Sequence, residues 1–234
     1  MRVMITGAAR GLGLCMVKEG LSRGHFIVAA VRELSSGAFR TPVEEETHNE
    51  MLEILNMDVA MPFSIHRAAA QLSASLEGLE AIVNNAAVLL GREATLEDVD
   101  IRAIMQSMEV NCYGPIRVTQ AFLPLLKQGK GQKYVLNISS ESGSYTDTRA
   151  DDYPYCISKG ALNMASEKMR QNLAPHGIGV MAVHPGWMCT DMGGPRGKNK
   201  PEDVAVRLWD MLEGKCKVDA IPAIVDAFGQ PLPL

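Results

Sequence analysis

The stretch TGAARGLG, residues 6–13, decides the fold. It follows a short apolar run at 2–6 and opens a segment at 11–24 whose apolar residues recur at helical spacing. Gly7 permits a tight turn, while Gly11 and Gly13 let the backbone and the helix approach a ligand closely. The helix start adds amide donors and a positive dipole end, which suit a pyrophosphate. This strand, turn and helix therefore predict a dinucleotide-binding unit.

The alternation of strands and helices continues along the chain. Patterns typical of buried strands recur at 25–31, 51–58, 79–87, 133–140, 179–186 and 223–228. Helical patterns lie at 63–78, 154–173 and 201–214, and two more within 95–128 are broken at 111–115. Most strands are apolar on both faces, as parallel strands covered by helices are. We predict one α/β domain over residues 1–234, a Rossmann-type doubly wound parallel sheet of about seven strands with helices on both faces.

Composition excludes several classes of protein. The chain has 234 residues, is 47% hydrophobic and carries a formal net charge of -4, which argues against a nucleic-acid-binding surface. No run approaches the roughly 18 apolar residues of a membrane helix, and the start lacks a signal-peptide core. The five cysteines form no Cys-x-x-Cys pair. We therefore expect reduced thiols, no metal site, no membrane anchor and a cytoplasmic location.

Five further segments stand in a recognisable order: NNAA at 84–87, VNCYG at 110–114, NISS at 137–140, YCISK at 155–159 and HPGWMCT at 184–190. Together with the G-x-x-x-G-x-G loop they resemble the short-chain dehydrogenase/reductase family over most of the chain. The segments at 155–169, 184–194 and 226–234 are most similar to the C-factor and sniffer-like carbonyl reductases of that family. This resemblance implies an NAD(P)-dependent oxidoreductase. Because that group includes members with signalling roles, an NADP-binding signalling or regulatory protein remains the alternative.

The residue at the end of the second strand selects the nicotinamide cofactor. An acid there favours NAD, whereas a basic residue favours the extra phosphate of NADP. The position of the acid is held by Val31, and Arg32 follows it. Arg10 in the glycine loop is within reach of the same phosphate, and two guanidinium groups on one phosphate discriminate strongly. We predict NADP(H) over NAD(H), although a shift of one residue would aim Glu33 at the ribose.

The resemblance implies further contacts with this cofactor. Asp58 and Val59 are expected to border the adenine, and Thr190 to hold the nicotinamide carboxamide. The complete set of expected cofactor-binding residues is Gly7, Arg10, Gly11, Leu12, Gly13, Arg32, Asp58, Val59, Asn84, Ala86, Tyr155, Lys159, Pro185, Gly186, Met188 and Thr190.

Reduction of a carbonyl group requires a proton donor beside its oxygen. Tyr155 and Lys159 are four residues apart and share one face of a helix, whereas Tyr153 is six residues from the lysine. Pro154 suits a first helical turn, which puts Tyr153 at or before the helix start. A nearby ammonium lowers the pKa of a tyrosine, which is ordinarily near 10. We therefore predict Tyr155 as the acid/base and Lys159 as the residue that lowers its pKa.

The resemblance supplies two more catalytic residues. Asn111 is implied to position Lys159 through water. Ser140, at the end of a strand, is implied to hold the substrate oxygen. The spacing from Tyr155 favours Ser142 instead, because the segment 141–154 is slightly longer than usual, and the choice stays open here.

The family's substrate loop corresponds to residues 187–200. An apolar wall of Trp187, Met188 and Met192 is expected there, faced by Glu141 and Tyr145. We expect a small apolar ketone or aldehyde as substrate. By the same resemblance, helices that begin near residues 112 and 154 are expected to form a homodimer interface.

Overall fold

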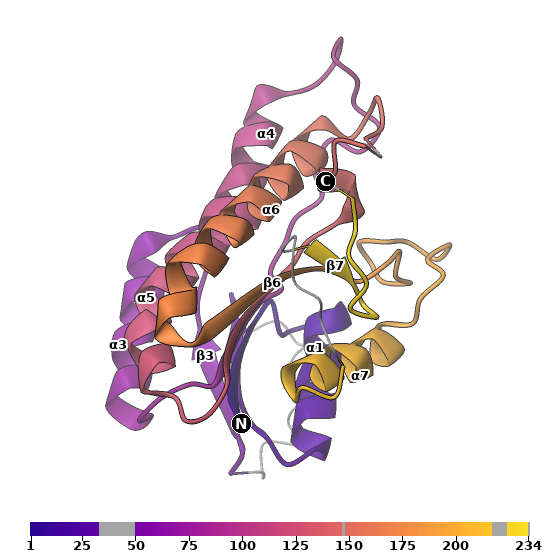
Figure 1. The fold of residues 1–234 in the computed structure, drawn as a ribbon. Helices are drawn as coiled ribbons and strands as arrows, with labels where there is room; N and C mark the ends of the chain where they lie inside the picture. Colours follow the sequence, from indigo (N-terminus) through magenta and orange to yellow (C-terminus); the bar gives the residue numbers. More distant parts are fainter. Residues whose placement is uncertain (33–49, 147, 217–223, 234) are drawn as a thin grey trace.

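A computed structural model describes residues 1–32, 50–146, 148–216 and 224–233. One parallel sheet runs through its centre in the order β3-β2-β1-β4-β5-β6-β7 (Figure 1). Its strands are β1 (Arg2–Thr6), β2 (Phe26–Val31), β3 (Leu52–Asn56), β4 (Ala81–Asn84), β5 (Lys133–Ile138), β6 (Ile178–His184) and β7 (Ile224–Asp226). The expected α/β fold is confirmed.

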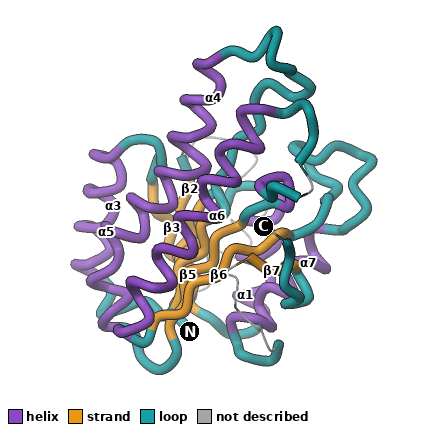
Figure 2. Tube along the Cα trace, turned by 45° about the horizontal axis from the view of Figure 1, so that its top comes forward, coloured by secondary structure: helices purple, strands orange, loops and turns teal. Residues whose placement is uncertain are grey.

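Helices cover both faces of the sheet (Figures 1 and 2). α1 (Gly11–Ser22) and α7 (Pro201–Leu212) lie on one face, and α3 (Pro62–Ser75), α5 (Gly114–Gln128) and α6 (Tyr153–Leu173) lie on the other. α4 (Ile101–Met108) stands beyond the carboxyl ends of the strands and packs beside α6. Within the described ranges, no helix has the length and apolar character needed to cross a membrane.

Each face of the sheet has its own apolar core. Along β1, Val3 and Ile5 pack toward α1 and α7, whereas Met4 packs toward α3 and α5. Phe122 of α5 and Trp209 of α7 are the largest apolar side chains in the two layers, and both are fully buried. Successive side chains of a strand point to opposite faces, so a sheet covered on both sides needs apolar residues at every position.

The strand order reverses beside β1. The chain runs from β1 to β2 on one side, and later enters β4 on the other side of β1. In open α/β sheets, ligands bind at such a reversal, outside the carboxyl ends of the strands. Residues 6–13 follow β1, and residues 84–87 follow β4. The topology therefore brings two of the sequence motifs to one edge of the sheet.

The helical break expected at 111–115 is instead a widened turn within a longer helix. A π-helical turn, Glu109–Tyr113, joins α4 directly to α5. Pro115 falls just after this turn and would disrupt ordinary α-helical bonding. The wider turn absorbs this disturbance, and turns of this kind occur frequently at functional sites.

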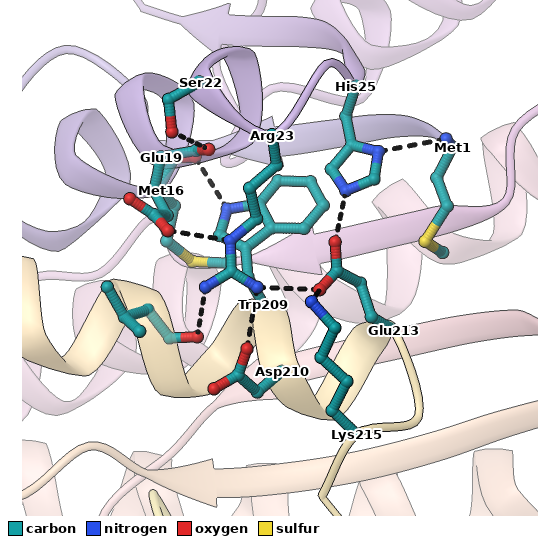
Figure 3. A network of polar contacts seen from close by, with 11 residues as sticks. Met1, Met16, Glu19, Ser22, Arg23, His25, Trp209, Asp210, Glu213 and Lys215 are labelled. Carbon is teal, nitrogen blue, oxygen red and sulfur yellow. Dashed lines mark hydrogen bonds and ion pairs between the residues drawn. The ribbon is translucent and has the colours of Figure 1, made fainter.

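At the opposite edge, Arg23 joins α1 to α7 (Figure 3). Its guanidinium donates to Glu19, Asp210 and Glu213, each at 2.7 Å. Burial alone would raise the pKa of Glu213, but hydrogen bonds from Lys215, His25 and Arg23 lower it to about 2. These contacts lie away from the carboxyl edge, so they stabilise the fold rather than form the candidate site.

Candidate functional site

The glycine loop is held against the end of β4. Thr6 Oγ1 accepts hydrogen bonds from the backbone N–H groups of Asn85 at 3.0 Å and Ala86 at 3.1 Å. Asn85 Nδ2 donates back to the carbonyls of Thr6 and Gly7. A Cβ at Gly7 would lie 2.8 Å from Ala86 Cα, and its φ is +64°. Sequence reasoning missed these reciprocal contacts of Thr6 and Asn85, although both residues stand within the motifs at 6–13 and 84–87.

The start of α1 presents its amide groups without a side-chain cap. Arg10 occupies the N-cap position with extended backbone, its side chain does not cap the helix, and the first turn contains no acid. The first amides of a helix carry positive partial charge and bind anions. Gly11 has a φ of +53°, and a Cβ there would lie 3.7 Å from Thr190 Cγ2. The loop after β6 therefore lies beside the glycine loop, as expected. Leu12, in contrast, directs its side chain into the core.

The Arg10 side chain contacts the loop after β6. Arg10 Nη1 forms an ion pair with Asp191 Oδ2 at 3.0 Å, and both side chains are about three-quarters exposed (73% and 78%). Arg10 thus ties the glycine loop to the loop after β6. The expectation that Arg10 and Arg32 converge on one phosphate stays a prediction, and in this structure Arg10 pairs with an acid 181 residues away. An exposed pair of this kind contributes less than about 1 kcal/mol.

A cavity of about 460 Å³ lies at the ends of β2 and β3. Its lining consists of Arg32, Asp58, Ala60, Val88, Arg102, Met105, Gln106, Glu109 and Val110. Two expected cofactor residues, Arg32 and Asp58, therefore share one cavity. Arg102 of α4 adds a second guanidinium that sequence reasoning missed, because no local pattern indicates which way α4 faces. Glu33 lies outside the described residues.

Two expected cofactor residues direct their side chains into the interior. Val59 is 8% exposed and packs where α5 begins, since a Cβ at Gly114 would lie 3.2 Å from Val59 Cγ2. Asn84 is 3% exposed and donates to Thr119 at 3.2 Å and to Asn137 at 2.8 Å. These side chains pack beneath the candidate site, and the expectation that both residues contact the cofactor stays a prediction.

Tyr155 and Lys159 lie together on α6, one turn apart. Lys159 is 2% exposed, its Nζ donates to the carbonyl of Ile138 at 2.7 Å, and Nζ lies 5.6 Å from the centre of the Tyr155 ring. Burial lowers the pKa of Lys159 from 10.5 to about 8. Tyr153 begins the helix and Pro154 follows in its first turn, as the sequence indicated.

The expected lowering of the Tyr155 pKa is not present. Burial raises the pKa of Tyr155 to about 12, and a hydrogen bond with Ser140 only partly opposes that rise. Lys159 directs its ammonium to the Ile138 carbonyl instead of the phenol oxygen. Desolvation of the phenolate therefore outweighs the favourable charge, and Tyr155 is protonated at neutral pH.

Ser140 is the serine that lies beside Tyr155, close enough to lower the pKa of the phenol. It directly follows β5, is 6% exposed, and its Oγ also accepts the N–H of Ser142 at 3.1 Å. A short 3-10 turn, Glu141–Gly143, takes up the extra length of the segment before α6. The choice of Ser140 over Ser142 as the serine that holds the substrate oxygen stays a prediction, and the position of Ser140 beside Tyr155 supports it.

Asn111 is 1% exposed and lies in the π-helical turn. Its side chain accepts from the N–H of Val88 at 2.8 Å and donates to the Val88 carbonyl at 2.9 Å. It also donates to Ser158 at 3.0 Å, one residue before Lys159. Asn111 thereby fixes the chain after β4 against α6 at the level of Lys159.

The loop after β6 folds partly on itself. Trp187 is 45% exposed and its Nε1 donates to the carbonyl of Gly193 at 2.7 Å, while Arg92 donates to the carbonyl of Met192. Met188 packs against the core on the α1 side, and Tyr145 is 86% exposed. Of the three residues expected to form the apolar wall, Met188 packs against the core instead, and Trp187 and Met192 remain.

The remaining expected residues lie at the same edge. Pro185 is buried, and its carbonyl accepts from Asn199 at 3.4 Å. Gly186 has a φ of +80°, which turns the chain out of β6. Among the residues that the structure describes, no group of three or more His, Cys, Asp or Glu side chains is placed to hold a metal ion.

Comparisons with a family model, with curated proteins and with solved structures give consistent results. A family model described as short chain dehydrogenase matches residues 1–201. C-signal of Myxococcus xanthus is 42% identical over 118 residues, which cover 50% of this chain and 70% of that protein. The solved structure of NADPH-bound carbonyl reductase from chicken fatty liver has a TM-score of 0.88 and 28% identity, covering 100% of this chain and 98% of the other.

Carbonyl reductase Sniffer of D. melanogaster has a TM-score of 0.89 and 26% identity over 100% of this chain and 99% of its own. The chain spans only 60% and 55% of the length of two dehydrogenases among its curated relatives. The match to C-signal and to both carbonyl reductase structures agrees with the group that the sequence resembles.

Proposed function

This chain belongs to the short-chain dehydrogenase family, and from that premise we propose that it is an NADP(H)-dependent oxidoreductase acting on a small apolar ketone or aldehyde, or on the corresponding secondary alcohol. The observation that carries the proposal is the pairing of Tyr155 with Lys159 on α6, with Ser140 close enough to the tyrosine to lower its pKa. Acid, hydrogen-bond donor and cation thus meet in one place, as carbonyl reduction requires.

The residues around the reversal of strand order fit a dinucleotide. The uncapped amides at the start of α1 suit a pyrophosphate. Gly11 adds no side chain on the side of the glycine loop that faces Thr190. Asp58 and Arg32 would hold the adenosine half in their shared cavity. Pro185, Gly186 and Thr190 would border the nicotinamide half. When bound, the reduced nicotinamide supplies a hydride for the carbonyl carbon.

The protein's own residues manage the proton. Tyr155, with its pKa near 12, is protonated at neutral pH and donates to the oxygen as the carbonyl becomes an alcohol. Ser140 hydrogen-bonds the same oxygen and holds it beside the tyrosine. Lys159 keeps its proton at neutral pH, because its pKa is about 8, and its ammonium stabilises the phenolate that remains. Asn111 keeps the chain after β4 in contact with α6, so Lys159 stays in place.

The preference for NADP(H) rests on Arg32 and Arg102. Both line the cavity at the ends of β2 and β3, where the adenosine ribose is expected. A 2′-phosphate between two guanidinium groups forms charge-assisted hydrogen bonds that NAD(H) lacks. The similarity to an NADPH-bound carbonyl reductase supports this choice.

A panel of ketones, aldehydes and secondary alcohols, assayed with NADPH and NADH, tests the proposal. We expect turnover of apolar carbonyl compounds and a higher kcat/KM with NADPH. Turnover with NADH alone would overturn the cofactor assignment. A protein that binds neither nucleotide in calorimetry would overturn the proposed function as a whole.

The match to C-signal favours a second candidate, an NADP-binding signalling or regulatory protein with secondary catalytic activity. The two candidates differ in what the nucleotide does. A protein that binds NADPH tightly but reduces nothing in a broad panel supports the regulatory candidate. Turnover at ordinary enzymatic rates supports the reductase.

We also infer a homodimer formed through α5 and α6. Apolar side chains are exposed on these helices and in the π-helical turn before α5: Tyr113 of that turn by 41%, Ile116 of α5 by 38%, and Ile157 and Met164 of α6 by 44% and 60%. Covering such groups is favourable by roughly 25 cal/mol per Å². A cytoplasmic location remains a prediction from composition, and fractionation of cells that produce the protein tests it.

A further inference from the structure

His184, the last residue of β6, contacts Glu141, the residue that follows Ser140, through both nitrogens of its ring. His184 Nδ1 accepts a hydrogen bond from the backbone N–H of Glu141 at 3.3 Å. On the other side of the same ring, Nε2 lies 3.5 Å from the Glu141 carboxylate. His184 is mostly buried, with a side chain that is 14% exposed. One residue of the turn after β5 is thus held by both nitrogens of one imidazole.

This contact fixes the peptide that joins Ser140 to Glu141. The N–H group that donates to His184 belongs to that peptide. The plane of the peptide sets the backbone direction of Ser140. A further bond ties the same segment to β6, because the N–H of Ser139 donates to the carbonyl of Val183 at 2.8 Å. Ser140 in turn lies close enough to Tyr155 to lower the pKa of the tyrosine. A continuous series of contacts therefore runs from β6 through Ser140 to the tyrosine.

The chemistry of imidazole defines the required state of His184. A nitrogen that accepts an N–H must carry a lone pair, so the proton of the neutral ring resides on Nε2 and faces the Glu141 carboxylate. A protonated ring has N–H on both nitrogens, and Nδ1 would then oppose the N–H of Glu141. The charged groups that face His184 are Glu141 from the 3-10 turn and Asp226 from β7, whose backbone is in register with it.

These two acids favour the charged ring, whereas burial disfavours it. Burial has the larger effect, so the pKa of His184 lies below its usual value of 6.5. The neutral ring that the Glu141 contact requires is accordingly the form present at neutral pH.

We propose that His184 is a positioning residue that holds Ser140 in the orientation in which its hydroxyl meets Tyr155. This inference rests on the proposed reductase function and deepens it. It acts on the chemical step and not on nucleotide binding, because its contacts are with the turn after β5 and not with the glycine loop. Acid conditions that protonate His184 release the turn and lower kcat.

Two substitutions separate the hydrogen bond from the bulk of the ring. His184→Asn keeps an acceptor close to the position of Nδ1 but does not titrate, whereas His184→Leu keeps volume without an acceptor. A displaced catalytic group can cost about 100-fold in rate, so we expect a fall in kcat of about 10- to 100-fold for His184→Leu. Its KM for NADPH and its calorimetric Kd for NADP⁺ stay at the wild-type values. His184→Asn keeps most of the kcat at neutral pH and loses the decline of kcat on the acid side.

His176, exposed in the 3-10 turn after α6, supplies the matched control. His176→Asn and His176→Leu are expected to leave kcat and its pH profile unchanged. Nitrogen NMR of the imidazoles gives a readout that needs no turnover: His184 Nδ1 should report an unprotonated, accepting nitrogen at neutral pH.

Three results overturn the inference: a wild-type kcat for His184→Leu, an equal loss in both His184 variants, or an acid decline that persists in His184→Asn. If His184→Leu does not fold, the pH profile of His184→Asn decides alone. A wild-type protein that reduces no carbonyl compound contradicts the proposed function instead, and the NMR experiment still tests the state of His184.

Discussion

Lys159 Nζ lies 5.6 Å from the centre of the Tyr155 ring and donates a hydrogen bond of 2.7 Å to the carbonyl of Ile138. The ammonium is thus beneath the aromatic ring and bonded to the end of β5, and it is almost wholly buried. A cation in that position is costly for folding, because burial penalises charge. Its placement beside a partly buried tyrosine suits the proposed proton transfer. Substitution of Lys159 therefore has different expected effects on activity and on stability.

Tyr155→Phe removes the proposed acid while keeping the ring. We expect kcat/KM for carbonyl reduction to fall by about 100- to 10,000-fold, the usual worth of a general acid. The Kd for NADPH, measured by calorimetry, should change little. Tyr153→Phe is the matched control and should retain most activity. The reverse result, an inactive Tyr153→Phe and an active Tyr155→Phe, would show that the wrong tyrosine is assigned.

Lys159→Met replaces the buried ammonium with an apolar chain of similar length. We expect loss of reductase activity together with a Tm that is higher by about 2–4 °C at neutral pH, the shift for roughly 1 kcal/mol in a chain of this size. The folded pKa of Lys159, about 8, is below the ordinary 10.5, so its charge destabilises the fold at neutral pH. Wild type recovers stability as pH rises from about 8 toward 10.5, where the folded state has already lost the proton.

The stability advantage of Lys159→Met should therefore shrink across that alkaline range, as urea unfolding at several pH values would measure. Lys127→Met, at an exposed position near the end of α5, should show neither effect. An advantage that is constant with pH would contradict the role given to the buried charge.

Arg32→Ala and Arg102→Ala each remove one guanidinium from the cavity at the ends of β2 and β3. Hydrogen bonds to charged groups contribute about 1.5–3 kcal/mol, so each change should weaken NADP⁺ binding by roughly 10- to 100-fold. Binding of NAD⁺, measured by the same calorimetry, should change much less. Arg10→Ala should alter the NADP⁺/NAD⁺ ratio little, because Arg10 pairs with Asp191.

Arg67→Ala, on the exposed side of α3, removes the same charge outside the cavity and serves as the control. Equal losses for both nucleotides in Arg102→Ala would show that this arginine does not contact the 2′-phosphate. A strong effect confined to Arg10→Ala would restore the original expectation from the sequence.

Glu80 joins three segments at the amino edge of the sheet. Its carboxylate accepts from Arg2 Nη2 at 2.7 Å, from the Arg2 N–H at 2.6 Å and from the Lys130 N–H at 3.0 Å. Burial alone would raise its pKa, but these bonds lower it from 4.5 to about 2. Because the folded pKa is the lower one, this stability is present above about pH 4.5 and is lost as pH falls toward 2.

Glu80→Gln should therefore cost about 1–2 kcal/mol of unfolding free energy at neutral pH, measured by urea titration. The difference from wild type should narrow below pH 4.5. A cost that is independent of pH would indicate that packing, and not the charge, makes the contribution.

Met164→Glu places a charge among the exposed apolar side chains of α6, which are Ile157 and Met164. If α6 contributes to a homodimer, light scattering should show a shift toward monomer, because a buried Met contributes about 1.5–3 kcal/mol. Phe63→Glu changes an apolar side chain on α3 that is 78% exposed and should leave the association state unchanged. A wild-type protein that is monomeric at high concentration would contradict the dimer.

Much of the site was predictable because its signals are local. The glycine spacing reports a conformation that only glycine adopts easily, and φ is +64° at Gly7 and +53° at Gly11. The Tyr155–Lys159 spacing reports helical periodicity. The strand patterns predicted the parallel sheet for the same reason, since the strands consist mostly of apolar residues, as FIVAAV in β2 does.

Other features were not predictable because they depend on residues far apart in the chain. Asn84 turns inward because Thr119 and Asn137 supply partners there. The chain between 101 and 128 stays helical because a π-helical turn accommodates Pro115. Neither the hydrogen-bond partners of a buried side chain nor a π-helical turn changes the hydrophobic periodicity of the sequence.

By itself, the sequence determined the fold and the family, and it predicted a phosphate-binding loop and the choice of Tyr155 over Tyr153, since φ preferences and helical spacing are properties of neighbouring residues. Only the tertiary structure decided that Ser140 meets Tyr155, that Arg102 joins Arg32 while Arg10 turns to Asp191, and that the pKa of Tyr155 rises to about 12. Desolvation and the direction of long side chains depend on what packs around a residue, and that surrounding is assembled from distant segments of the chain.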